Sequence, residues 1–129
     1  DAADSGDDAE QVASGLAEQL KCIVAVTGAV DTISDGTHTL RIRNGHPALS
    51  GITGTGCMCT SLIASFCGGN PKEPMLSAAA GIICMGIAGE IAWEKAGTSG
   101  NGSFHAALLD AVSLMDGKTL QRLAKYDEK

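Results

Sequence analysis

The stretch GITGTGCMCTSLIASF, residues 51–66, sets three glycines ahead of two cysteines and then becomes an apolar run. The apolar run predicts a helix from about Cys57 to Cys67, and the loop Asn44–Gly56 leads into it. Glycines allow the backbone to approach an anion, and the first N–H groups of a helix have no partner within the helix. The loop therefore either binds a phosphate group or serves only to pack the chain, as many glycine-rich loops before helices do.

The two cysteines after the loop raise the alternative of a metal site. Two steps along a helix rotate the side chain by roughly 200°, so the thiols of Cys57 and Cys59 point apart. A Cys-x-Cys pair with no second pair or histidine nearby is a poor zinc site, and we expect no metal ligands in this chain. Cys57 lies in the first turn, where the helix dipole favours a thiolate. It is either a reactive thiol or a small buried side chain.

The composition indicates a globular protein, and we expect residues 1–129 to belong to one domain because this length supports a single core. The net charge is −6 and the nine Lys and Arg residues are dispersed, so we expect no nucleic acid partner. An odd number of cysteines, five, in mostly apolar surroundings indicates reduced thiols and a cytoplasmic protein. The charge-free run Met75–Gly89 predicts a buried core helix, not a membrane span, because Glu90 follows it directly.

The order of the elements predicts an α/β fold. Apolar residues at a spacing of four predict an amphipathic helix over residues 7–21. The run Cys22–Gly28 is apolar on both faces, which predicts a buried parallel strand. Ligands of α/β sheets bind beyond the carboxyl ends of strands, so Thr27 is a candidate contact for phosphate or ribose. The Asp35-Gly36 pair predicts a tight hairpin at the sheet edge. Further helices are predicted over Met75–Lys95, Ser103–Met115 and Thr119–Lys125.

Six blocks of the sequence together resemble the hydroxyethylthiazole kinases, in that family's order and spacing. The blocks are VAVTGAVD at 24–31, SDG at 34–36, NGHP at 44–47, TGTGC at 53–57, GIAGEIAWEKA at 86–96 and GSFHAALLDA at 102–111. Enzymes of this family phosphorylate the hydroxyethyl group of the thiazole half of thiamine. The resemblance covers nearly the whole chain, but it corresponds only to the C-terminal half of a family member.

The resemblance implies a ribokinase-like three-layer fold, in which a mostly parallel central sheet lies between layers of helices. It also implies ATP and Mg²⁺ as cofactors, hydroxyethylthiazole as the acceptor, and a trimer with active sites near the subunit interfaces. By the same resemblance, ATP would contact Thr27 and Gly28, the thiazole would contact Gly54, and the transferred phosphoryl group would meet Thr55, Gly56 and Cys57.

Cys57 stands where the wider ribokinase group commonly has an aspartate that acts as a base. Phosphoryl transfer depends chiefly on positioning and charge stabilisation. We therefore expect the backbone of residues 54–56 to matter more than the Cys57 thiol. In the family, the upstream half supplies much of the acceptor pocket, the acidic residues near magnesium and an arginine for the nucleotide.

Two other interpretations stay open from the sequence. One is a related kinase for another small alcohol, such as hydroxymethylpyrimidine, and the other is a non-catalytic remnant used for assembly. In each case we expect this chain to expose the edge of its strand and one face of the Met75–Lys95 helix. It would then pair with a partner that carries the upstream half.

Overall fold

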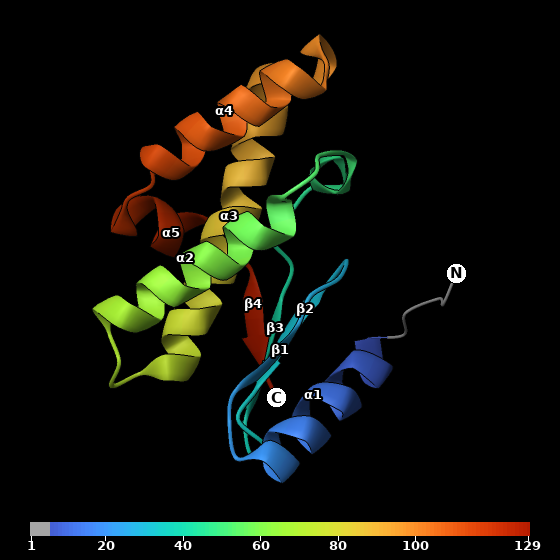
Figure 1. The fold of residues 1–129 in the computed structure, drawn as a ribbon, viewed down its shortest axis with the longest axis vertical. Coiled ribbons are helices and arrows are strands. Elements are labelled where there is room, and N and C mark those ends of the chain that lie inside the picture. The colour runs from blue at the N-terminus through green and yellow to red at the C-terminus, as the bar shows by residue number, and fades with distance from the viewer. Residues whose placement is uncertain (1–5) are drawn as a thin grey trace.

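The computed structural model describes residues 6–129, which form five α-helices and one four-stranded sheet (Figure 1). In chain order the elements are α1 (Gly6–Leu20), β1 (Val24–Val26), β2 (Asp31–Ser34), β3 (Thr39–Ile42), the 3-10 turn η1 (Pro47–Gly51), α2 (Thr55–Gly69), α3 (Pro74–Ala96), the 3-10 turn η2 (Gly97–Ser99), α4 (Asn101–Ser113), α5 (Gly117–Leu123) and β4 (Tyr126–Glu128). The predicted α/β class and all five predicted helices are confirmed, with small shifts at their ends.

The sheet of residues 6–129 is antiparallel throughout, with the strand order β1-β2-β3-β4. The hairpin formed by β2 and β3 is confirmed, and Asp35 accepts hydrogen bonds in its turn from the N–H groups of Thr37 and His38, each at 2.8 Å. Its predicted place at the sheet edge is wrong, because β4 pairs with β3 and β1 pairs with β2. The polar residues of β4 carry no strand pattern in the sequence.

β1 is the strand that the sequence predicts to be parallel and buried on both faces. Among the described residues its partner is β2, which runs antiparallel, so a parallel pairing is not confirmed. Burial on both faces is wrong for these residues, since Ala25 is exposed while Val24 and Val26 are half-buried. An apolar run predicts a strand. The run itself does not encode the direction of the neighbouring strands or which elements cover its two faces.

The two faces of the sheet are covered by different helices (Figure 1). Ile33 packs in one apolar cluster with residues of α3, so that face of β2 looks toward α3. Successive side chains of a strand alternate between faces, so the buried Thr32 and Ser34 look the other way, toward α1. α1 packs against β1 and β2, and its buried residues are the small side chains of Ala9, Ala13 and Ala17.

α3 lies at the centre of the molecule, between α2 and α4 and against β2, β3 and α5. Its residues 81–89 are buried without interruption, which confirms the prediction of a core helix. The prediction that one face of this helix is exposed is wrong, because α2 and α4 pack on it from two sides. By length and composition alone α3 could cross a membrane, but 72% of its most apolar window is buried inside the protein.

An exposed apolar flank lies on α1 instead. Val12, Leu16 and Leu20 follow one another at a spacing of four and are 50%, 40% and 61% exposed. Glu10 pairs with Lys129 beside β4, and Val12 and Leu16 lie roughly 200° and 240° around the helix from it. These side chains therefore point away from β4, toward the side of β1. We call Val12, Leu16, Leu20 and the outer edge of β1 the open flank.

Candidate functional site

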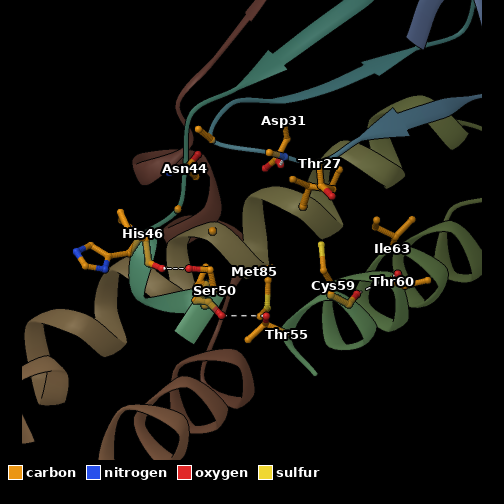
Figure 2. Close-up of a pocket in the computed structure, with 18 residues that line it drawn as sticks. Thr27, Asp31, Asn44, His46, Ser50, Thr55, Cys59, Thr60, Ile63 and Met85 are labelled. Atoms are coloured by element: carbon orange, nitrogen blue, oxygen red, sulfur yellow. Dashed lines mark hydrogen bonds between the residues drawn. The ribbon is translucent and has the colours of Figure 1, made fainter. Parts of the chain in front are cut away.

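A cleft of about 740 Å³ lies where the β1–β2 loop meets the loop after β3 and the helices α2 and α3 (Figure 2). Its lining residues come from four segments, 27–31, 44–50, 55–63 and 82–86. The cleft begins where β1 ends, which is the side on which α/β sheets bind their ligands. Segments that are distant in the sequence thus meet around one cavity of the size of a small-molecule site.

Four of the six predicted site residues line this cleft. Thr27 and Gly28 lie at the end of β1, and Thr55 and Gly56 lie at the start of α2 on the facing side. The other two predicted residues, Gly54 and Cys57, are exposed and are not part of the lining. The structure therefore brings the predicted ATP contacts and part of the phosphoryl loop together. Their roles stay predictions.

The start of α2 is suited to an anion. Gly54 precedes the helix with φ +95°, a left-handed conformation that glycine adopts without strain. The first helical hydrogen bond runs from the Met58 N–H to the Gly54 carbonyl at 2.9 Å. The N–H groups of residues 55–57 precede it and are left without helical acceptors. They stand at the positive end of the α2 dipole. Apart from its chain neighbours and the helix's own backbone, no atom lies within 4 Å of a Cβ built on Gly56, so a ligand can approach the backbone there.

The Thr55 side chain connects the start of α2 to η1 by hydrogen bonds. Its hydroxyl donates to the Leu49 carbonyl at 3.1 Å, with the Ile52 carbonyl at 3.4 Å, and so ties η1 to the start of α2 (Figure 2). With its hydroxyl proton committed to the protein, Thr55 can offer a phosphoryl group its backbone N–H and the lone pairs of its oxygen.

Cys59 occupies the place in the cleft that the sequence assigned to Cys57. It lines the cleft and points toward the β1–β2 loop, whereas Cys57 is exposed to solvent (Figure 2). Burial first, and then the negative charge of Asp31 and the nearby Cys84, together raise the pKa of the Cys59 thiol to about 11. Cys59 is therefore a neutral thiol at neutral pH. All five cysteines are free, and residues 6–129 hold no group of three potential metal ligands.

Asp31 is a cleft residue that the sequence reasoning missed. Its Oδ1 accepts a hydrogen bond from the Gly28 N–H at 2.9 Å, which closes the turn after β1. Burial raises the pKa of Asp31, and the bond from Gly28 acts against that rise. Among the described residues that line the cleft, Asp31 is the one acidic side chain, and none is a lysine or arginine. An aspartate three residues after a turn glycine was the signal that could have identified it.

Two glycines of α3 let one wall of the cleft lie close against that helix. We call residues 44–50 the wall. A Cβ on Gly86 would lie 2.6 Å from the carbonyl oxygen of Asn44, and a Cβ on Gly89 would lie 2.7 Å from Cδ1 of Leu49. Gly86 is therefore required by its contact with backbone atoms, whereas at Gly89 the flexible end of the Leu49 side chain would have to move.

The same face of α3 also holds the wall through polar and aromatic contacts. Oε1 of Glu90 accepts a hydrogen bond from the Gly45 N–H at 2.9 Å. The Trp93 ring stacks on His46, with centroids 4.3 Å apart and planes at 19°. His46 points away from the cavity (Figure 2), and its Nδ1 accepts from the Ala48 N–H, so this histidine caps η1. Positions 86, 89, 90 and 93 lie on one face of the helix. The block GIAGEIAWEKA thus supplies the residues of α3 that contact the wall.

Comparisons with known proteins agree on one family. The sequence model of the hydroxyethylthiazole kinase family matches residues 1–117. A hydroxyethylthiazole kinase of Ruminiclostridium cellulolyticum is 50% identical over 121 residues, which cover 94% of this chain and 44% of that protein. One from Clostridium beijerinckii is 47% identical over 128 residues, 99% of this chain and 46% of that protein. The structure of a hydroxyethylthiazole kinase protein from Pyrococcus horikoshii superposes with a TM-score of 0.88 at 35% identity, over 96% of this chain and 47% of that one. The chain spans about half the length of the curated relatives it matches.

Proposed function

Because the chain belongs to the hydroxyethylthiazole kinase family, we propose that it forms the phosphoryl-transfer half of a kinase for hydroxyethylthiazole in thiamine salvage. Residues 1–129 would be the C-terminal portion of a single ribokinase-like domain whose complete sheet is mostly parallel. The observation that carries the proposal is the cleft, in which the end of β1 faces the glycine-led start of α2.

In the proposed reaction the hydroxyl oxygen of the thiazole attacks the γ-phosphorus of ATP. The bond from this phosphorus to the bridging oxygen breaks, and ADP leaves with the electron pair. Thr27 and Gly28 would contact ATP and Gly54 the thiazole. The free N–H groups and the dipole at the start of α2 would stabilise charge on the phosphoryl group in transfer. The hydroxyl proton passes to solvent or to a phosphate oxygen, because Cys59 is already protonated at neutral pH.

The chain offers little positive charge for ATP. No lysine or arginine is found among the described lining residues, and Asp31 adds a negative charge. A magnesium ion is normally held by one or two carboxylates together with substrate phosphates, and residues 6–129 hold no cluster of three potential ligands. Asp31 is the one carboxylate that the described lining residues offer, and we assign no step through the metal. The cations of the complete site would come from the other half of the enzyme or from a neighbouring subunit.

The other half would dock on the open flank. A strand added to the outer edge of β1 would extend the sheet and satisfy its unpaired backbone groups. Burying Val12, Leu16 and Leu20 at the same time would remove the exposed apolar stripe from water. We propose a cytoplasmic homo-oligomer, a trimer, for the completed enzyme.

The function is tested by joining the chain to the N-terminal half of the Ruminiclostridium cellulolyticum relative. ATP consumption is then measured with hydroxyethylthiazole, with hydroxymethylpyrimidine and without an acceptor. We expect consumption that depends on the thiazole in the joined protein and none in the chain alone. If the joined, folded protein consumes no ATP with either acceptor, the chain is an assembly remnant. If hydroxymethylpyrimidine is preferred, the acceptor is misassigned.

The site is tested by substitutions in α2 of the joined protein. Gly56→Val fills open space at the start of α2, where the free N–H groups lie. We expect kcat to fall by about 10²–10³-fold, the cost of losing an oxyanion donor. Gly68→Val is the matched control, because Gly68 lies in the same helix, also has open space, and is not part of the cleft. We expect Cys57→Ser to keep most of the activity. A larger loss in Cys57→Ser than in Gly56→Val would overturn this assignment.

A further inference from the structure

The last seven residues of the chain are joined to the wall of the cleft, although they follow the part matched by the family model, residues 1–117. We call residues 123–129 the latch. Its strand β4 pairs with β3, with Tyr126 opposite Ile42. Just beyond β3, the Arg43 N–H donates to the Lys125 carbonyl at 2.8 Å. The pairing thus reaches the residue before the wall begins.

Asn44 is buried and is the first residue of the wall, and both the nitrogen and the oxygen of its side-chain amide form hydrogen bonds with the latch. Its Nδ2 donates to the Leu123 carbonyl at 2.9 Å, and its Oδ1 accepts from the Lys125 N–H at 2.8 Å. A buried amide that loses such partners is strongly disfavoured. The position of Asn44 is therefore set by the latch as much as by β3.

Glu90 of α3 joins the latch to the wall a second time. Its Oε2 lies 3.0 Å from Nζ of Lys125, while its Oε1 accepts from the Gly45 N–H at 2.9 Å and from Nδ2 of Asn44 at 3.3 Å. Burial opposes the ionisation of Glu90, but the hydrogen bonds from Gly45, Lys125 and Asn44 outweigh it and lower the pKa. One carboxylate thus bridges the latch, the wall and the central helix.

We propose that the latch positions the wall of the cleft, with Asn44 and Glu90 as the positioning residues, and so sets how tightly the cleft holds its ligand. The positioning of the wall by the latch is inferred from contacts within this chain alone. The effect of the wall's position on substrate affinity rests on the proposed function.

Trp93 provides a readout that does not depend on catalysis. It is the single tryptophan of the chain, and its ring is covered on one side by His46 of the wall. With 39% of its surface exposed, it is partly shielded from a solute quencher. Movement of the wall removes His46 from the ring and makes Trp93 more accessible.

The test compares three variants of the contacts between latch, wall and α3 with a control, all in the chain of residues 1–129. Asn44→Ala removes the side-chain hydrogen bonds to Leu123, Lys125 and Glu90. Lys125→Met removes the ion pair alone, and Glu90→Gln removes the ion pair but keeps an acceptor for the Gly45 N–H. Lys129→Met is the control, because it breaks the 3.0 Å contact with Glu10 in the same segment without touching the wall. We expect acrylamide quenching of Trp93 to rise most in Asn44→Ala, less in Lys125→Met and Glu90→Gln, which both lose the ion pair, and little in the control, with far-UV circular dichroism unchanged.

In the joined enzyme we expect Asn44→Ala to raise the KM of at least one substrate roughly tenfold, the effect of about one net hydrogen bond, with kcat little changed. If Asn44→Ala fails to fold, Lys125→Met decides against the Lys129→Met control. Equal quenching in these two variants would overturn the inference, and so would a shifted Trp93 signal with both KM values unchanged. Should the unmodified enzyme lack kinase activity while Trp93 still responds, the proposed function fails and the positioning of the wall stands.

Discussion

Replacing Gly86 by alanine tests the contact between α3 and the wall. The new Cβ would lie 2.6 Å from the carbonyl oxygen and 2.7 Å from the carbonyl carbon of Asn44. Real Cβ atoms essentially never approach within 3.0 Å, so helix and wall must separate by at least 0.4 Å, the difference between 3.0 and 2.6 Å. The atoms in contact are backbone, and the Asn44 side chain is bonded to the latch, so no rotamer change relieves the clash.

The sign of the effect follows from two opposing contributions. In a helix with open surroundings, alanine stabilises relative to glycine by roughly 0.5–1 kcal/mol. Inserting a methyl group into a packed contact costs roughly 1–3 kcal/mol. We therefore expect Gly86→Ala to lower the free energy of unfolding by about 1 kcal/mol, against the helix propensity.

Urea unfolding followed by circular dichroism and Trp93 emission measures this change. Gly15→Ala in α1 is the matched control, because its added Cβ has no atom within 4 Å apart from its chain neighbours and the helix's own backbone. We expect that control to gain roughly 0.5–1 kcal/mol. If Gly86→Ala gains stability as Gly15→Ala does, the close approach of the wall to α3 is refuted.

Three further results are expected. Hydrogen bonds from the N–H groups of His38 and Thr37 are the main cause that lowers the pKa of the Asp35 carboxyl to about 2. The charged carboxylate therefore stabilises the hairpin fully above the ordinary pKa of 3.8, and this stabilisation is lost as the pH falls toward 2. Asp35→Asn should therefore flatten the acid limb of a urea-midpoint profile against pH, and parallel profiles would contradict this. Iodoacetamide at mildly alkaline pH should label the exposed Cys22 and Cys57 before Cys59 and Cys84, because burial raises the pKa values of the latter two. Peptide mass mapping measures the order of labelling, and equal rates at all four cysteines would contradict their burial. If the open flank docks the N-terminal half of the Ruminiclostridium cellulolyticum relative, Leu16→Asp should reduce co-purification with that half. Leu114→Asp, at an 81% exposed site after α4, should not.

The helices were predictable because their signals are local. The spacing of Val12, Leu16 and Leu20 defines α1 in the sequence, and the glycines before residue 55 mark the start of α2. β4 was not predictable, since Tyr126–Glu128 is polar and its strand exists through pairing with residues more than eighty positions upstream. The direction of pairing at β1 likewise depends on chain that is distant from the run itself.

The segments that form the site were predictable, but the face of α2 that lines the cleft was not. The separation of Cys57 and Cys59 indicates that they face opposite ways, but which one faces the cleft depends on how the Gly54 turn sets the helix against α3. The stripe of residues 86, 89, 90 and 93 is visible in the sequence as a spacing. Its partner, the wall, lies some forty residues earlier and could not be paired with it from periodicity alone.

Ile82 and Met85 of α3 belong to the buried core and also line the cleft. Truncating such a side chain to alanine to admit a bulkier ligand would cost about 2–5 kcal/mol, a large part of the roughly 5–15 kcal/mol that stabilises a typical domain. The shape of the cleft and the stability of the fold are therefore coupled at these two positions. An engineer or an evolving lineage that reshapes the cleft has more latitude at Thr60, which lines it from the exposed side of α2.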